Sequence, residues 1–482
     1  MEKVLGRFIL IISKKNEVYL NIKTEPNYAR ELSDFFTFEV PGARFMPSYR
    51  NKYWDGKIRL FNQMNGEVYV GLLPYIEEFA KRNELDIEYK EGVKDEGEHR
   101  TSILGGFVRR VSPKSKGKTL QIRDYQMAAF THAVRNNRSL SLSPTASGKS
   151  LIIYLLSRWY ESNRVLILVP TTSLVEQMYT DFLDYGYVES KMQKIYQGHS
   201  REITKEITIS TWQSLYKMPK KYFEQFGCIL GDEVHLFKAK SLTNIMNKMH
   251  QTQYRHGFTG TLDGTQTHRL VLEGLFGRAE KVVSTKELMD KKSLAQLKIK
   301  CIILKHSNIR EKFSYAEELD YIVTNENRIN FCCDLLRHLS GNTLCLFQLV
   351  EKHGKVLYDK IGEDNAFFVY GATSAEQREE IRAIVDRSDK SITIASYGTF
   401  STGINIRNIN NIVLASPSKS KIRVLQSIGR GLRIAENKNS VLIFDIADDL
   451  GNDNYTLRHF TERLNIYNEE QFDYDISKVK LK

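Results

Sequence analysis

The chain has 482 residues, of which 41% are hydrophobic and 27% are charged, and it carries a formal net charge of +12. This length is too great for one compact core and predicts about three domains. No stretch reaches the roughly 20 apolar residues of a membrane helix, and the five cysteines lack the paired spacing of a structural zinc site. The positive charge favours a polyanionic partner, either nucleic acid or an anionic membrane surface.

The first part of the chain predicts a small α+β domain, 1–100. The turn signal Asn65-Gly66 between two apolar runs predicts a β-hairpin. The expected strands are 4–13, 18–22, 57–62 and 67–73, and the expected helices are 25–36 and 74–84.

Basic and aromatic residues are interleaved between positions 44 and 59. Five cations stand against one carboxylate, Asp55, for a net charge of +4. Cationic groups neutralise phosphates and aromatic rings stack on bases, so this segment is a candidate grip on nucleic acid. The alternative is a solvated basic hairpin whose aromatic residues form the core of the small domain. The candidate contacts are Arg44, Arg50, Lys52, Trp54, Lys57 and Arg59.

The segment Ser143-Pro-Thr-Ala-Ser-Gly-Lys-Ser150 lies between a β-like run, 139–143, and an apolar helical pattern, 151–156. Strand, turn and helix in this order are the context of a phosphate-binding loop, because a helix N-terminus offers free N–H groups and partial positive charge. Gly148 lets the backbone approach a phosphate, Lys149 can reach the β- and γ-phosphates, and Ser150 can ligate Mg²⁺. Ser143 stands where the usual pattern has glycine, and the alternative is a Ser/Gly turn before an ordinary helix.

From residue 123 onward, apolar runs alternate with helical patterns, which predicts parallel sheets with helices on both faces. The first sheet domain is expected at 101–288, and a second, without a phosphate loop, at 289–450. A tail, 451–482, is expected to begin as a helix and to end in a loosely held basic segment, 478–482. The expected strands are 139–143, 164–170, 207–211, 226–231 and 256–260 in the first domain, and 297–304, 341–348, 366–370, 392–395, 411–415 and 440–445 in the second.

Two carboxylates, Asp232 and Glu233, follow the expected strand 226–231. Beside a phosphate loop, Asp232 would hold Mg²⁺ through water, and Glu233 would orient and deprotonate an attacking water. The alternative is an acidic strand end without a role, and the presence of Gly148-Lys149-Ser150 in the same predicted sheet argues against it.

These segments and several others, in the same order, resemble the DExH group of superfamily-two helicases. The resemblance implies an α/β fold of two tandem RecA-like parallel-sheet domains preceded by the small α+β domain. The resemblance is narrowed to recombination helicases of bacteriophages by the segment Tyr53-Trp-Asp-Gly-Lys57. The matching segments are Arg123–Gln126, Val169–Gln177, Ser210–Leu215, Asp232–His235, Phe258–Leu262, Tyr397–Asn405 and Gln426–Arg433.

The resemblance also implies residue roles. Gln126 would bond the adenine edge, Gln426 would bond His235, and Arg430 and Arg433, three apart on a predicted helix, would act as arginine fingers. The implied catalytic residues are Lys149, Asp232, Glu233, Gln426, Arg430 and Arg433. The residues implied to bind the nucleotide are Arg123, Gln126, Thr145, Ser147, Gly148, Lys149, Ser150 and Gly403, and those implied to bind Mg²⁺ are Ser150 and Asp232. The residues implied to contact DNA phosphates are Thr171, Thr211 and Thr402.

We therefore expect an enzyme that uses ATP and Mg²⁺ to unwind and branch-migrate DNA in recombination, repair and replication. The resemblance implies 3′→5′ movement on forks, Holliday junctions or R-loops, with RNA–DNA hybrids as a further substrate and a single-strand-binding protein as a partner. It is expected to act as a monomer in the cytoplasm, that of the host cell for a phage protein, and not on a membrane. Two alternatives stay open, an RNA helicase and a nucleic-acid-binding protein with weak ATPase activity.

Overall fold

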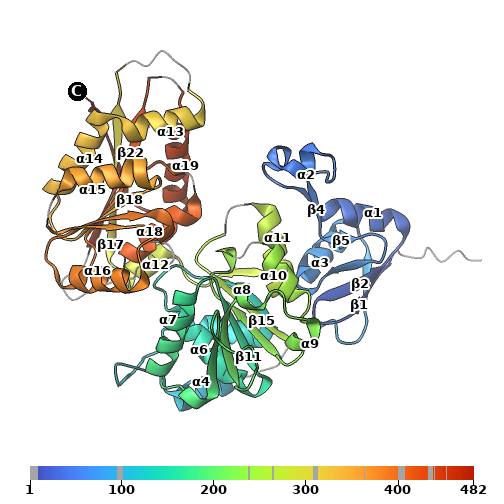
Figure 1. The fold of residues 1–482 in the computed structure, drawn as a ribbon. Helices are drawn as coiled ribbons and strands as arrows, with labels where there is room; N and C mark the ends of the chain where they lie inside the picture. Colours follow the sequence, from blue (N-terminus) through green and yellow to red (C-terminus); the bar gives the residue numbers. More distant parts are fainter. Residues whose placement is uncertain are drawn as a thin grey trace, which may run out of the picture. The chain divides into compact units, whose positions relative to one another are not determined.

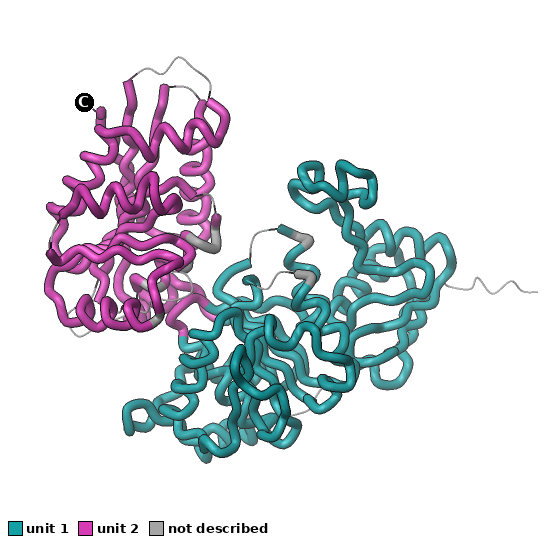
Figure 2. Tube along the Cα trace, in the orientation of Figure 1, with its two compact units in different colours: residues 1–143, 148–282 teal, residues 144–147, 283–482 magenta. Residues whose placement is uncertain are grey.

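The computed structural model describes residues 9–94, 101–236, 239–262, 265–307, 313–362, 364–399, 406, 408–418, 420–432, 438, 440–451 and 453–481. Contacts divide the chain into two compact units (Figure 2). The first contains Met1–Ser143 and Gly148–Val282, and the second contains Pro144–Ser147 and Val283–Lys482. Among the described helices, none is both long and apolar enough to cross a membrane.

The first unit begins with a five-stranded sheet. Its members are β1 (Ile9–Lys14), β2 (Tyr19–Lys23), β5 (Phe61–Asn62), β6 (Glu67–Tyr69) and β7 (Asp86–Tyr89), in the order β5-β6-β2-β1-β7. Alternate residues of β1 and β2 are buried, which is typical of a sheet with one face on a core. Helices α1 (Pro26–Phe35) and α3 (Leu73–Arg82) contribute Leu32 and Ile76 to that core.

A second, two-stranded ribbon leaves this small domain. Strands β3 (Thr37–Glu39) and β4 (Lys57–Arg59) pair antiparallel, and the short helix α2 (Pro47–Arg50) lies between them in the chain. Figure 1 shows α2 at the far end of the ribbon, apart from α1 and α3. We call residues 37–59 the basic ribbon.

The sequence predicted one strand at 57–62, whereas the structure has two short strands there. The first three residues of this segment form β4 and pair with β3, while Phe61 and Asn62 form β5 and pair with β6. Leu60, between them, is buried and its N–H donates to the carbonyl of Phe36. The chain changes sheet at this residue because its side chain belongs to the core.

The rest of the first unit is a parallel sheet of seven strands, in the order β12-β13-β11-β14-β15-β10-β16. Leu166 and Leu168 of β11 belong to one hydrophobic cluster and Val165, Ile167 and Val169 to another, so both faces of the sheet are covered. The strands are β10 (Arg138–Leu142), β11 (Val165–Val169), β12 (Met192–Ile195), β13 (Ile207–Thr211), β14 (Cys228–Gly231), β15 (Tyr254–Thr259) and β16 (Ala279–Lys281), and the main helices are α5 (Asp124–Asn136), α6 (Lys149–Trp159), α7 (Thr172–Asp184), α10 (Ala239–Met246) and α11 (Gln266–Phe276).

The small domain packs directly on this sheet domain. The cluster that contains Leu10 and Ile76 also contains Leu140 and Phe276, so the two share one core. Gly71 touches α11: a Cβ there would lie 2.0 Å from the carbonyl oxygen of Glu273. The Glu273 carboxylate also accepts a hydrogen bond from the hydroxyl of Tyr75.

The second unit is another parallel sheet of seven strands, in the order β19-β20-β18-β21-β22-β17-β23. The two parallel sheets confirm the tandem RecA-like architecture expected from the sequence. The strands are β17 (Gln296–Lys305), β18 (Thr343–Phe347), β19 (Ala366–Val369), β20 (Ile392–Ser396), β21 (Asn411–Leu414), β22 (Ser440–Asp449) and β23 (Tyr474–Lys480), and the longer helices are α13 (Tyr315–Thr324), α14 (Glu326–His338), α16 (Ala375–Arg387), α18 (Lys421–Gly431) and α19 (Tyr455–Glu469).

The prediction of a loosely held basic end is wrong. Residues 474–480 form β23, which pairs in parallel with β17, and Leu481 is buried in the same core as Ile446. The strands β12 and β16 also escaped prediction, because both are short and carry few apolar residues.

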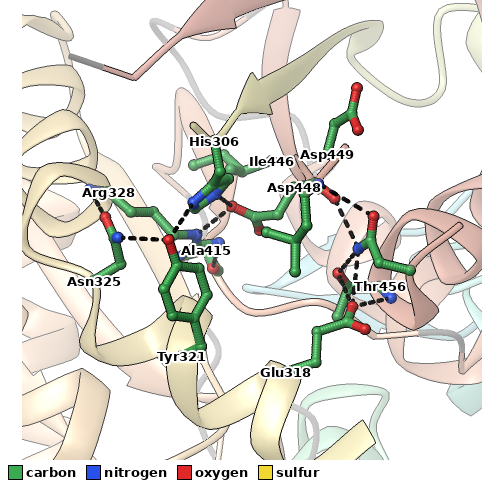
Figure 3. Close-up of polar contacts among 12 residues, drawn as sticks. His306, Glu318, Tyr321, Asn325, Arg328, Ala415, Ile446, Asp448, Asp449 and Thr456 are labelled. Atoms are coloured by element: carbon green, nitrogen blue, oxygen red, sulfur yellow. Dashed lines mark hydrogen bonds and ion pairs between the residues drawn. The ribbon is translucent and has the colours of Figure 1, made fainter. Parts of the chain in front are cut away.

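A buried polar network lies at the carboxyl ends of β17, β21 and β22 (Figure 3). Asp448 accepts a hydrogen bond from Nε of Arg328 at 2.7 Å and lies 2.9 Å from the Nε2 atom of His306. Arg328 also donates to the carbonyl of Ala415 at 2.7 Å. Burial alone would raise the pKa of Asp448, but Arg328 and His306 hold it below its ordinary value. The pair therefore ties the start of α14 to the carboxyl edge of the sheet.

Candidate nucleotide and nucleic-acid sites

The phosphate loop is shaped by two residues with left-handed backbone. Ala146 has a φ of 67° and Gly148 a φ of 84°, and Gly148 is the N-cap of α6. The loop begins with Ser143, whose N–H donates to the carbonyl of Thr259 in the neighbouring strand. Free N–H groups of the first helical turn and such a concave loop bind anions. This geometry can hold the phosphates of a nucleotide.

Lys149 lies between the loop and the acidic strand end. Its Nζ atom donates to the carbonyl of Ser143 at 3.2 Å and lies 3.5 Å from Oε1 of Glu233. Oε2 of Glu233 lies 3.4 Å from Nδ1 of His235, which in turn lies 2.5 Å from the hydroxyl of Thr259. Residues from three separate segments of the sequence are thus brought into one chain of polar contacts.

Asp232 and Glu233 lie at the carboxyl end of β14, as the sequence predicted. Burial, followed by the neighbouring Glu233 carboxylate, raises the pKa of Asp232 to about 7, against the effect of Lys149. Glu233 has a φ of 49°, a conformation that costs free energy for a residue other than glycine and persists where surrounding structure enforces it. The strained turn directs the Glu233 carboxylate toward Lys149.

Gln126 packs against the phosphate loop. A Cβ at Gly148 would lie 2.4 Å from its Nε2 atom, and the left-handed φ of 84° independently favours glycine at this position. The Oε1 atom of Gln126 accepts a hydrogen bond from the N–H of Arg123, within the first turn of α5. Gln126 is buried and Arg123 is exposed, so the two predicted adenine-binding residues are joined at the start of one helix.

Ser150 contacts a residue that the sequence did not single out. Its Oγ atom lies 2.8 Å from the hydroxyl of Tyr185, at the C-terminal cap of α7. Burial raises the pKa of Tyr185 to about 12, so the phenol is protonated at neutral pH. No motif signals this contact, because the two residues are distant in sequence and meet only through the packing of α6 and α7.

Thr171 and Thr211 lie at the same edge of the first parallel sheet. Thr211 ends β13, where it pairs with Val169 of β11, and Thr171 follows β11 as the N-cap of α7. The side-chain amide of Gln213 donates to the carbonyl of Pro170 and joins the two loops. This is the edge at which α/β sheets carry ligand sites.

The basic ribbon is exposed along its length. All five of its cationic side chains are exposed, and the Trp54 ring is half-buried. Tyr53 is 86% exposed and Tyr49 is 40% exposed, so the alternative that these aromatic residues form the core is wrong. Arg59 is paired with Asp55, while Trp54 donates from Nε1 to the carbonyl of Lys57. A polyanion could contact these exposed groups without any unfolding of the small domain.

The predicted residues of the second unit are only partly described. Gln426 and Arg430 lie on α18, with their side chains outside the described part of the structure. Thr402, Gly403 and Arg433 lie outside the described residues.

Three protein-family models match the chain. They are described as DNA helicase UvsW, N-terminal, at residues 12–90; type III restriction enzyme, res subunit, at 119–264; and helicase conserved C-terminal domain, at 327–435.

Individual proteins are similar over longer spans. The ATP-dependent DNA helicase uvsW of Enterobacteria phage T4 is 32% identical over 494 residues, covering 96% of this chain and 98% of that protein. The DNA 3′-5′ translocase XPB2 of Sulfurisphaera tokodaii is 22% identical and covers 67% of this chain and 81% of that protein. The crystal structure of T4 UvsW matches with a TM-score of 0.54 at 30% identity, covering 98% of this chain and 100% of that one.

Proposed function

The chain belongs to the UvsW family of ATP-dependent DNA helicases, and on this premise we propose that it moves 3′→5′ along DNA and remodels branched structures. Forks, Holliday junctions and R-loops are the substrates we favour, in recombination, repair and replication. The observation that carries the enzymatic part is the contact of Lys149 with Glu233 beside a phosphate loop. The 3′→5′ polarity is supported by the similarity to the DNA 3′-5′ translocase XPB2.

We assign the ATP site to the phosphate loop, 143–150, and to the first parallel sheet that carries it. Lys149 would exchange its contact with Glu233 for the β- and γ-phosphates, which frees the Glu233 carboxylate to orient and deprotonate the attacking water. Gln126 would bond the adenine edge beside Arg123. The loop residues Thr145, Ser147 and Gly148 would surround the phosphates.

Mg²⁺ fits the oxygen donors at this site. The ion is held in proteins by one or two carboxylates together with substrate phosphates, and the buried Asp232 carboxylate and the Ser150 hydroxyl are groups of this kind. When bound, it would neutralise negative charge on the nucleotide phosphates.

The second unit would complete the cycle. By resemblance, Arg430 and Arg433 would stabilise charge on the transferred phosphoryl group, and Gln426 and Gly403 would support the nucleotide. Thr402 would grip the DNA backbone together with Thr171 and Thr211. Contacts of this kind position the strand without reading its sequence, so we expect little sequence preference.

The basic ribbon would hold duplex DNA ahead of the motor. Its exposed cations can neutralise phosphates, and Tyr53 and Trp54 can stack on exposed bases. We further propose action as a monomer, in the host cytoplasm, in cooperation with a single-strand-binding protein.

The ATPase assignment is tested by Lys149→Ala. We expect at least a hundredfold loss of DNA-stimulated ATP hydrolysis with DNA binding retained, because one phosphate-binding cation is removed. Lys191→Ala, which removes an exposed lysine paired with Glu161, is the control and should behave like the parent. Parental hydrolysis by the Lys149 variant would disprove the site.

The substrate assignment is tested by unwinding and ATPase measurements on 3′-tailed and 5′-tailed duplexes, forks, four-way junctions, RNA–DNA hybrids and duplex RNA. Faster turnover on 3′-tailed and branched DNA is expected. A preference for duplex RNA would instead establish the RNA-helicase alternative.

The basic ribbon is tested by the double variant Arg50→Ala with Lys52→Ala. Two lost phosphate contacts should weaken binding to forked DNA and reduce the salt slope of the binding constant by about two. Lys81→Ala with Arg82→Ala, which removes equal charge from exposed positions on α3, is the control. Equal slopes for both double variants would rule out a specific role for the ribbon.

A further inference from the structure

Tyr185 contacts the phosphate loop from outside every motif of the chain. Its hydroxyl lies 2.8 Å from Oγ of Ser150, the second residue of α6. The neighbouring hydroxyl in the same aromatic cluster, that of Tyr187, is buried and has no hydrogen-bond partner among the described residues. The contact with Ser150 is therefore particular to Tyr185 and does not follow from aromatic packing alone.

We propose that Tyr185 is a positioning residue for the binding of Mg²⁺-nucleotide. Its phenol donates a hydrogen bond to Ser150 and holds the serine hydroxyl in the orientation that a metal ligand requires. The inference rests on the proposed role of Ser150 as a Mg²⁺ ligand. It adds a residue to that site from a different helix.

The hydrogen-bonding capacity of serine allows this arrangement. A hydroxyl has one proton and two acceptor lone pairs. With one lone pair accepting from Tyr185, the second can face the ion, and the proton of Ser150 remains to be donated to a carboxylate or phosphate oxygen. The tyrosine thus fixes the rotation of the hydroxyl and does not compete for the metal.

The tyrosine is itself held on several sides. Its ring packs on Tyr154, with ring centroids 5.2 Å apart, and its carbonyl accepts hydrogen bonds from the hydroxyl of Tyr154 and the N–H of Lys114. The adjacent Asp184 carboxylate accepts from the N–H of Lys116 and the hydroxyl of Ser115. Supporting contacts of this kind hold a metal-binding side chain in a fixed orientation.

The experiment measures binding of a fluorescent ADP analogue to the full-length protein with Mg²⁺ and with EDTA. In the parent, Mg²⁺ tightens binding by some factor. Tyr185→Phe keeps the ring and removes the hydroxyl, so we expect that factor to fall about three- to tenfold, the range for one lost hydrogen bond, with the affinity in EDTA unchanged. Tyr187→Phe is the matched control and should keep the parental factor.

The variant Ser150→Ala tests the proposed role of Ser150 as a Mg²⁺ ligand separately from the positioning role of Tyr185. If this variant loses the Mg²⁺ effect while Tyr185→Phe retains it, Tyr185 has no positioning role and the metal site stands. If both variants retain the effect, Ser150 is not a Mg²⁺ ligand and the inference fails with that assignment. A lower thermal unfolding midpoint for Tyr185→Phe with both affinities unchanged would show a purely structural hydroxyl and would also overturn the inference.

Discussion

Asp232 is a buried carboxylate beside a second one, Glu233, and both belong to the proposed ATP site. Burial and that neighbour raise the pKa of Asp232 from 3.8 to about 7. Between these two values the folded state keeps a proton that the unfolded state releases, so stability falls as pH rises through this window and is constant above it. The site is therefore built at the expense of the free energy of folding.

Replacing Asp232 with Asn should stabilise the metal-free protein. The amide oxygen can still accept from the N–H of Glu233, and the buried charge is gone. We expect the free energy of unfolding at pH 8 in EDTA to rise by about 1–3 kcal/mol, with the gain shrinking toward pH 5 and absent below pH 4. Urea unfolding at several pH values measures this.

The control is Asp290→Asn, at an exposed position on α12 (Thr285–Asp290). Its effect should stay within about 0.5 kcal/mol at every pH. A pH-independent change in the Asp232 variant would contradict the raised pKa.

At the scale of single residues, the sequence identified those members of the candidate site that belong to a recognisable motif. Lys149 and Glu233 meet as expected, because a loop and a strand end at the same edge of a parallel sheet are neighbours. Tyr185 could not be found, because its hydroxyl reaches Ser150 through the packing of two helices, and no local pattern encodes that distance.

Among the elements, β23 shows where strand prediction fails. Its apolar residues, Tyr474, Ile476 and Val479, are exposed or half-buried and do not keep a spacing of two, so the alternation that identifies a strand is incomplete. Pairing comes from the backbone, which bonds to the edge of β17. The strands β11, β13 and β18, buried at every residue, were all predicted. β11 and most of β18 are continuous apolar runs, and β13 alternates isoleucine with small hydroxyl residues.

Leu481→Ala tests whether this segment is structural. The side chain is buried in the same hydrophobic core as Ile446, and its N–H donates to the carbonyl of Lys305. We expect the second unit to lose about 2 kcal/mol of stability, at the low end for a core leucine. Ile476→Ala removes a side chain that is 48% exposed and should change stability by less than about 0.5 kcal/mol.

Thermal and urea unfolding distinguish the two variants. A loosely held tail would leave both of them as stable as the parent.

For the molecule as a whole, the small domain and the first RecA-like domain act as one body. They share a hydrophobic core, and Gly71 lies so close to α11 that a side chain cannot be placed between them. The alternation of strands and helices predicted both parallel sheets. It could not predict this docking, which depends on a backbone approach at one glycine.

Gly71→Ala should weaken this attachment. The added methyl would meet the carbonyl oxygens of Glu273 and Gly274 at 2.0 and 2.7 Å, so the backbone must separate, and we expect a loss of about 1–3 kcal/mol in the unfolding of the first unit. Gly106→Ala, in helix α4 (Thr101–Val111) with no described residue near the added methyl, should instead raise stability by about 0.5–1 kcal/mol. If the two variants unfold alike, the close contact at Gly71 is unimportant.

The place of β17 in the chain also determines how long it waits for its partner strands during synthesis of the second unit. This strand pairs with β22, where Gln296 meets Ser440, and with β23, where Ile299 meets Tyr474. At a synthesis rate of about 5–20 residues per second, β17 leaves the ribosome on the order of ten seconds before its first partner. During that time both of its edges can pair with a neighbouring nascent chain, so crowded polysomes and strong expression should favour aggregation of this half of the protein.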